Sequence, residues 1–198
     1  MPYLVPPCIP PGSLAALDQP SVPVKGGLLL RPWRQTDAAA LAAAFTDPGI
    51  QRWHVRRIDS EEEARGWITR CQERWQAETG IQWAVVPGDG GDLLGRASLR
   101  SVHLAEGRAE CAYWTVPAAR GSGVAVRAVS AMTHWAFEEM GFHRLELAHS
   151  VANHASCRVA AKAGFAREGT RRSAHLHIDG WHDMHLHARI REDRPAAV

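Results

Sequence analysis

The sequence predicts a mixed α/β domain, in which segments of strand character and of helical character alternate along the chain. Two observations predict this class. Apolar residues recur at helical spacing in some segments and in short strand-like runs in others. A glycine-containing loop, residues 120–123, joins one kind of segment to the other. The composition, 45% hydrophobic and 22% charged over 198 residues, is that of a globular protein and argues against a disordered, collagen-like or membrane-bundle chain.

Residues 28–75 are predicted to hold one strand and two helices. Residues 28–31 form a short apolar run that Pro32 stops, which is typical of a strand. A helix capped at Thr36-Asp37 is expected to run to Phe45. Ser60 and Glu63 have the spacing of a capping box, and an apolar helical face follows them, formed by Ala64, Trp67, Ile68, Cys71 and Trp75.

The second half is predicted to be richer in strands. Asp179-Gly180 is a strong hairpin signal between the last two strands. Glycines 141 and 164 stand where helices commonly end. The expected strands are 81–86, 93–101, 108–116, 144–149 and the two around residue 179, and the expected helices follow the loop at 120–123 and cover 155–163.

This order predicts a mixed central sheet of about seven strands with about four helices packed on it. Seven of the twelve prolines precede residue 24, so we expect residues 1–25 to form an extended arm. The domain itself is then expected to span residues 26–192, with a short tail at 193–198.

Charge and cysteine content restrict the partners. Lys+Arg 23 against Asp+Glu 21 gives a net charge of only +2, and the charges are intermixed, so a nucleic-acid partner is not expected. The N-terminus lacks the basic start and apolar core of a signal peptide, and the apolar runs are short, so no membrane association is expected. The cysteines Cys8, Cys71, Cys111 and Cys157 show no C-x-x-C spacing, which predicts free thiols in the cytoplasm.

The loop from Arg120 to Ala125 is the most informative motif. It connects a strand to a helix, and its glycines let backbone N–H groups approach a ligand at the positive end of that helix. A pyrophosphate is the ligand expected at such a loop. The loop lacks both the third glycine of the dinucleotide fingerprint and the Gly-Lys-Ser/Thr of a Walker loop.

Arg120, Gly123 and Ala125 match the three fixed positions of the motif Gln/Arg-x-x-Gly-x-Gly/Ala. With its flanking segments, the chain resembles the GNAT (GCN5-related) N-acetyltransferase superfamily, in particular its ribosomal-protein N-terminal acetyltransferase-like branch. Four segments in the right order carry the resemblance, which covers about residues 27–190: Leu-Leu-Leu-Arg-Pro-Trp from residue 28, Ala-Glu-Cys-Ala-Tyr-Trp from 109, Asn-x-x-Ser-x-x-Val from 153, and Asp-Gly-Trp-His-Asp from 179.

The resemblance implies a sheet splayed beside the loop and an N-acyltransferase that moves an acetyl or other short acyl group from acyl-CoA directly to a primary amine. It implies no metal and no further cofactor. The acceptor is a peptide or protein α-amine or a small-molecule amine, and a homodimer is left open. The implied CoA-binding residues are Trp114, Thr115, Val116, Arg120, Gly121, Ser122, Gly123, Val124, Ala125, Asn153 and Ser156.

For catalysis, the resemblance makes Glu110 the candidate base and Ser156 the candidate contact to the CoA sulfur, because the family's tyrosine is replaced by Ala160. Trp53 and His54 are expected near the acceptor, and His187 is a further candidate there. An α-amine, with a pKa of about 7.7–8.0, loses its proton far more readily near neutral pH than a lysine at about 10.4.

A purely structural interpretation remains open for each of these candidate site residues. The loop could be a structural turn, Glu110 a surface ion-pair partner and Ser156 a helix-start hydrogen bonder. A non-catalytic CoA-binding sensor or partner protein is the main alternative, an antibiotic-modifying enzyme a second, and a histidine-rich metal-binding module a third. The acyl group could also be succinyl, with arginine holding its second carboxylate.

Five of the eleven histidines fall within residues 175–187. Alternation in the last two strands predicts that Leu176, Ile178, Met184 and Leu186 face inward and that the histidines lie on the opposite face, toward solvent or a cleft. His185 and His187 could bind zinc in principle, but neither a cysteine nor a carboxylate evidently completes a ligand set.

Overall fold

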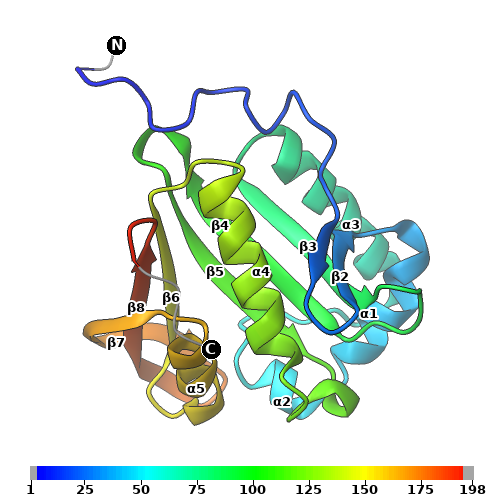
Figure 1. The fold of residues 1–198 in the computed structure, drawn as a ribbon. Helices are drawn as coiled ribbons and strands as arrows, with labels where there is room; N and C mark the ends of the chain where they lie inside the picture. The colour runs from blue at the N-terminus through cyan, green and yellow to red at the C-terminus, as the bar shows by residue number, and fades with distance from the viewer. Residues whose placement is uncertain (1–3, 194–198) are drawn as a thin grey trace.

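The computed structural model describes residues 4–193, which form one mixed sheet with helices on both faces (Figure 1). Eight strands lie in the order β1-β2-β3-β4-β5-β6-β8-β7. Neighbouring strands are antiparallel except β5 and β6. The strands are β1 (Val22–Val24), β2 (Leu28–Pro32), β3 (Gly80–Pro87), β4 (Gly95–His103), β5 (Arg108–Thr115), β6 (Arg144–Ser150), β7 (Ala166–His177) and β8 (Gly180–Ile190).

The helices divide between the two faces of the sheet. One apolar core lies between the sheet and α4, and a second lies between the sheet and α1 and α3. The helices are α1 (Ala38–Ala44), α2 (Pro48–Gln51), α3 (Glu61–Gln76), α4 (Val124–Glu138) and α5 (His154–Lys162). Three short 3-10 turns are added to them, η1 (Gln35–Asp37), η2 (Leu104–Glu106) and η3 (Pro117–Ala119). The mixed α/β fold predicted from the sequence is confirmed, with one strand more than expected.

Local sequence signals account for the helix ends. Ser60 Oγ accepts a hydrogen bond from Glu63 N at 3.1 Å, so the predicted cap of α3 is formed. Asp47 caps α2 by accepting from Ile50 N at 2.9 Å. α2 is not among the helices expected from the sequence, because Pro48-Gly49 directly after the first expected helix is more typical of a turn. Proline at the first helical position is in fact a favourable start.

The proline-rich N-terminal segment differs from the expected arm outside the domain. It runs across one end of the sheet (Figure 1), and residues 22–24 pair with β2 as β1. Ile9 and Leu14 are buried, and the indole N–H groups of Trp75 and Trp83 donate to the carbonyls of Leu17 and Pro20, each at 2.9 Å. A buried indole requires a hydrogen-bond acceptor, and the irregular backbone of this segment supplies it.

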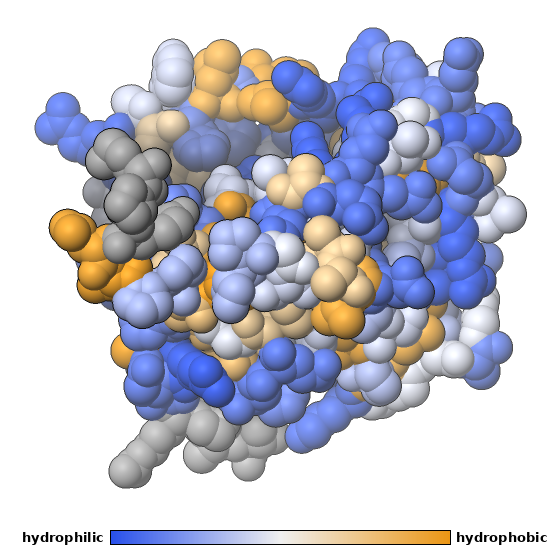
Figure 2. Space-filling model, turned by 90° about the horizontal axis from the view of Figure 1, so that it is seen from above, coloured by the Kyte–Doolittle hydropathy of each residue, from blue (hydrophilic) through white to orange (hydrophobic). Residues whose placement is uncertain are grey.

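The expected tail at 193–198 lies outside the described residues except for its first position. Within residues 4–193, no helix has the length and apolar character needed to cross a membrane. Figure 2 looks onto the end of the molecule that carries the N-terminal segment, where apolar patches are small and separated by hydrophilic residues.

His185 and His187 of β8 face a helix, whereas the sequence predicted that they would face solvent or a cleft. β8 is an inner strand between β6 and β7, and its neighbours in register pair His149 with His185 and Leu147 with His187. These side chains lie on the face that α5 covers, so His187 is only 3% exposed. Conversely, the predicted inward positions Leu176 and Ile178 are 50% and 80% exposed, because they belong to the tip of the β7–β8 hairpin beyond the packed part of the sheet.

Candidate active site

A cleft of about 610 Å³ opens where β5 and β6 separate. The two strands pair only from Arg108 to Glu110 on β5 and from Arg144 to Glu146 on β6, and no pairing is recorded between them further along the described chain. The splay predicted beside the loop is therefore present. The cleft is lined by residues of α2, β5, the loop before α4, the first turn of α4, and α5.

Most of the predicted site residues line this cleft. Those that do so are Trp53, His54, Trp114, Thr115, Arg120, Gly121, Gly123, Val124, Ala125, Asn153 and Ser156. Of the predicted residues in the described chain, Glu110, Val116, Ser122 and His187 lie outside the lining. Ser122 Oγ instead donates to the Ala119 carbonyl at 2.8 Å and closes the turn, and Val116 N donates to the Leu94 carbonyl at 3.0 Å.

The loop has the geometry expected of an anion site. Gly121 and Gly123 adopt φ values of +78° and +79°, a left-handed conformation that glycine takes without strain. Gly123 is the N-cap of α4 and has no side chain to satisfy the first helical N–H groups. Those groups, from Val124 to Val126, line the cleft and carry the positive end of the helix dipole.

The Arg120 side chain is engaged with α2. It forms an ion pair with Asp47, the same residue that caps α2, and this hydrogen bond holds the pKa of the Asp47 carboxyl below its usual range. The contact ties the loop to the segment that carries Gly49 and Ile50 along the cleft. Free cationic side chains at the cleft come instead from α5, where Arg158 and Lys162 are exposed.

Trp114 contributes mainly its backbone to the cleft. Its indole is 6% exposed and packs between Trp33 and Phe45, with ring centroids 6.5 and 6.0 Å away. Beyond residue 110, β5 is paired on its β4 side and not on its β6 side. Its outward backbone groups along the cleft therefore need a partner from a bound molecule or water.

A tyrosine that the sequence analysis did not single out completes the floor of the cleft. Tyr113 Oη and Ser156 Oγ lie 2.6 Å apart, across the gap between β5 and α5. Asn153 Oδ1 accepts from Ser156 N at 3.0 Å and fixes the first turn of α5. Burial raises the pKa of Tyr113 to about 12, so its phenol is protonated at neutral pH and can donate a hydrogen bond. Its position directly before Trp114, in a strand expected to flank CoA, was the available signal.

Glu110 lies apart from this set. Its Oε1 accepts from Arg100 Nη2 at 2.5 Å, between strands paired at these two residues. This carboxylate is engaged by a guanidinium and does not line the cleft. The geometry thus favours the ion-pair reading of Glu110 over the role of base.

His54 is better placed than Glu110 to act as the base. It lines the cleft, and its Nδ1 lies 2.7 Å from the Ile50 carbonyl, so the neutral ring donates there and leaves Nε2 as an acceptor. Burial lowers the pKa of His54, with Arg96 and Arg100 adding to the effect, which favours the neutral ring at pH 7. Trp53 stands next to it, with ring centroids 5.7 Å from His177 and 6.2 Å from His182 of the β7–β8 hairpin.

A second, smaller cavity of about 260 Å³, called the groove below, shares one lining residue with the cleft, His54. It lies between the segment after α2 and the end of β7. Its other lining residues are Gln51, Val55, Arg56, Arg57, Leu176, His177 and Ile178. The exposed apolar side chains of Val55, Leu176 and Ile178 and the two arginines give this groove a mixed apolar and cationic character.

Comparison with known proteins agrees with this architecture. Residues 27–166 match the family model described as an acetyltransferase (GNAT) domain. The chain is 31% identical to the probable N-acetyltransferase YjcK of Bacillus subtilis, over 84% of this chain and 95% of that protein. It is 28% identical to the uncharacterized N-acetyltransferase YoaA of the same organism, over 73% and 82% of the two chains.

Two solved structures share the fold. Mycobacterium smegmatis RimJ in complex with CoA-disulfide superposes with a TM-score of 0.83 at 22% identity, covering 90% of this chain and 91% of that one. RimL, a ribosomal L7/L12 alpha-N-protein acetyltransferase in complex with coenzyme A, gives a TM-score of 0.79 at 23% identity and covers 86% and 98% of the two chains.

Proposed function

Because the chain belongs to the acetyltransferase (GNAT) family, we propose that this N-acetyltransferase moves the acetyl group of acetyl-CoA to the α-amino group at the N-terminus of a protein. The observation that carries the proposal is the junction at His54. There, one side chain borders both the cleft, whose loop has the geometry to bind an anion, and the groove. A donor and an acceptor that enter by separate routes would meet at this side chain.

The cleft fits the parts of CoA in order. The N–H groups at the start of α4 bind the pyrophosphate, and Arg158 and Lys162 supply positive charge close by. The amides of the pantetheine arm pair with the free edge of β5 at Trp114 and Thr115, as an added strand would. This arrangement leads the thioester toward Tyr113 and Ser156.

The groove fits an extended peptide. The apolar side chains of Val55, Leu176 and Ile178 offer contacts to the first residues. Arg56 favours an acceptor with acidic residues near its N-terminus, whereas Arg57 is already paired with Asp59. RimL, whose structure is similar, is a ribosomal L7/L12 alpha-N-protein acetyltransferase, which supports this acceptor class. An α-amine also needs a weaker base than lysine does.

His54 accepts the proton of the amine. The free amine nitrogen attacks the thioester carbonyl carbon, a C–N bond forms, and the C–S bond breaks as the tetrahedral intermediate collapses. The proton lost by nitrogen passes to His54 Nε2 and then to solvent. The CoA sulfur leaves as a thiolate and receives a hydrogen bond from the Tyr113–Ser156 pair.

The test is release of CoA thiol from acetyl-CoA in the presence of short peptides. Peptides with a free N-terminal Ser or Ala and acidic residues after it are expected to be substrates, and the same peptides with a blocked N-terminus are expected to be inert. Binding of CoA measured separately by calorimetry keeps failure of the acceptor distinct from failure of the donor site. Tight CoA binding without turnover on any free α-amine would contradict the proposal.

A further inference from the structure

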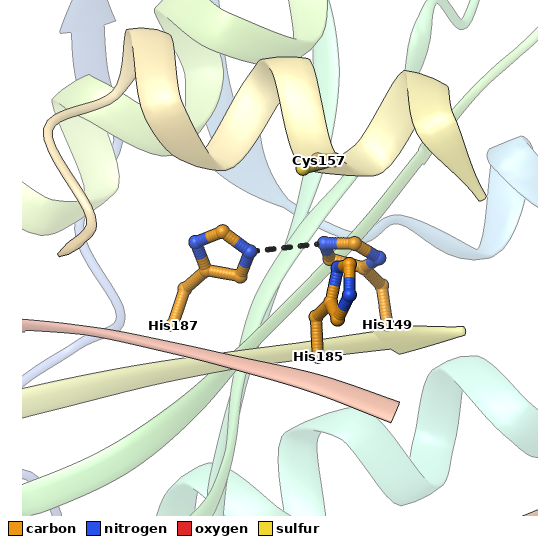
Figure 3. Close-up of side chains that lie close together, drawn as sticks. All are labelled: His149, Cys157, His185 and His187. Atoms are coloured by element: carbon orange, nitrogen blue, oxygen red, sulfur yellow. Dashed lines mark hydrogen bonds between the residues drawn. The ribbon is translucent and has the colours of Figure 1, made fainter. Parts of the chain in front are cut away.

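Four side chains with metal-binding atoms lie together beneath α5, outside the cleft. His149 comes from β6, Cys157 from α5, and His185 and His187 from β8. One ligand atom of each lies within 4.8 Å of every other. Figure 3 shows the three imidazoles below the helix and Cys157 on the helix side that faces them. The sequence offered only His185 and His187 as possible ligands. The structure adds His149 as a third imidazole and Cys157, from a different element, as a fourth candidate.

The spacing is close to that of a tetrahedral zinc site. Zinc–nitrogen bonds of about 2.0–2.1 Å put two ligand nitrogens about 3.3 Å apart. His149 Nε2 and His187 Nε2 are 3.2 Å apart, and their rings stack at 26° with centroids at 5.1 Å. The other ligand atoms lie up to 4.8 Å apart, and side-chain rotations would bring each of them to bonding distance from a central zinc ion.

The protonation state also suits a cation. His149 Nδ1 lies 2.8 Å from the Ser150 carbonyl, so the neutral ring donates there and presents the lone pair of Nε2 to the cluster. His185 Nδ1 and His187 Nδ1 are buried and make no hydrogen bond of normal geometry with the described residues.

We infer that His149, Cys157, His185 and His187 form a structural zinc site that fastens α5 to β6 and β8. All four positions are filled by protein, so no position remains for a catalytic water. Binding forms a zinc–sulfur bond, and the proton of the Cys157 thiol passes to solvent. The inference is independent of the proposed acceptor, because it concerns a site outside the cleft.

The site would act on the cleft through α5. Ser156, which contacts Tyr113, precedes Cys157 directly in the same helix. A metal that fixes Cys157 against β6 and β8 therefore fixes the position of Ser156 on the other side of the splay. The zinc ligands are positioning residues for the cleft rather than catalytic ones.

The experiment measures zinc bound to the untagged full-length protein, purified under reducing conditions, by elemental analysis and by competition with a zinc indicator. We expect one zinc per chain. Cys157→Ser and His187→Gln should each weaken zinc binding by more than about 100-fold, since even outer-shell partners are worth about 10–100-fold. The matched controls Cys8→Ser and His134→Gln change an exposed cysteine and an exposed histidine and should bind zinc as the parent does.

Cobalt(II) provides a second readout that does not depend on stability. The cobalt-loaded protein should show a thiolate-to-cobalt charge-transfer band that Cys157→Ser lacks, while the circular dichroism of both proteins confirms that they are folded. A reduced, folded parent protein that neither retains zinc nor competes with the indicator would overturn the inference. The cluster would then be a set of neutral histidines linked by the His149–His187 hydrogen bond.

Discussion

The cleft and the histidine cluster lie on either side of one short helix and differ in almost every physical respect. Ser156 of α5 contacts Tyr113 of β5 in a cavity of about 610 Å³, whereas the next residue, Cys157, meets three histidines of β6 and β8 in a closed space. On the cleft side, the backbone groups of β5 beyond residue 110 that face away from β4 lack a strand partner and can bind a ligand. On the other side, one ligand atom from each of four side chains lies within 4.8 Å of every other. α5 thus connects the cleft, where CoA must exchange, to the proposed zinc site, where the metal stays bound.

The largest effect is expected at the junction of cleft and groove. His54→Gln removes the proton acceptor and should lower kcat by about 10²–10⁴, the usual contribution of a general base, while the Kd for CoA stays unchanged. His134→Gln, an exposed histidine of α4, is the control and should leave kcat unchanged. Steady-state kinetics with a free α-amine peptide provides the measurement. If Glu110→Gln lowers kcat as much as His54→Gln does, the base would be Glu110 of β5 instead of His54.

Removal of metal should affect stability on the closed side. At a free zinc concentration about 100 times its Kd, linkage contributes about 2.7 kcal/mol to the free energy of unfolding. For a chain of this length, we expect chelation to lower Tm by about 5–10 °C. Thermal unfolding of the parent and of Cys157→Ser, each with and without chelator, checks this. An equal shift in both proteins would show that the chelator acts elsewhere.

Tyr113→Phe tests the floor of the open side. Loss of a hydrogen bond to a charged sulfur is worth about 1.5–3 kcal/mol, and because Ser156 can still donate, we expect a fall in kcat of about 10-fold. The double variant with Ser156→Ala should lose less than the product of the two single effects, since the two hydroxyl groups share one hydrogen bond. Independent, multiplicative losses would separate the two residues.

The smallest effect concerns the pH profile. The acceptor α-amine titrates at about 7.7–8.0, so log kcat/KM should fall with a slope of one below that range. Burial lowers the pKa of His54 below 6.5, so its neutral form persists to a more acidic pH, and the slope should steepen to two only below that pKa. In His54→Gln this second break should disappear. A break that persists in the variant would assign it to another group.

The two sides of α5 also differ in how far the sequence predicts them. The loop at 120–125 is a contiguous motif whose glycines and flanking segments carry its chemistry, and most of its residues line the cleft as expected. Tyr113 could have been found from its place in the same strand. The strand β1 was also within reach, because it pairs with β2 as a local hairpin across Gly26-Gly27. The buried segment before it was not, because its contacts with Trp75 and Trp83 join residues nearly 60 positions or more apart.

The histidine cluster was beyond reach for the same reason. His149, Cys157 and His187 come from three elements, and their convergence depends on β8 lying between β6 and β7. Alternation along β8 correctly separates Met184 from His185 and His187, but it cannot tell which face a helix covers. The ion pair of Glu110 with Arg100 likewise depends on the register of β4 and β5.

The most direct test of the central claim is to locate the transferred acetyl group by tandem mass spectrometry. The substrate is an acidic peptide that carries both a free α-amine and one lysine, incubated at neutral pH with acetyl-CoA and the protein. The account predicts acetylation at the α-nitrogen by the parent protein and at a rate lower by about 10²–10⁴ with His54→Gln. Acetyl groups found mainly on the lysine side chain, or equal rates for the two proteins, would contradict it.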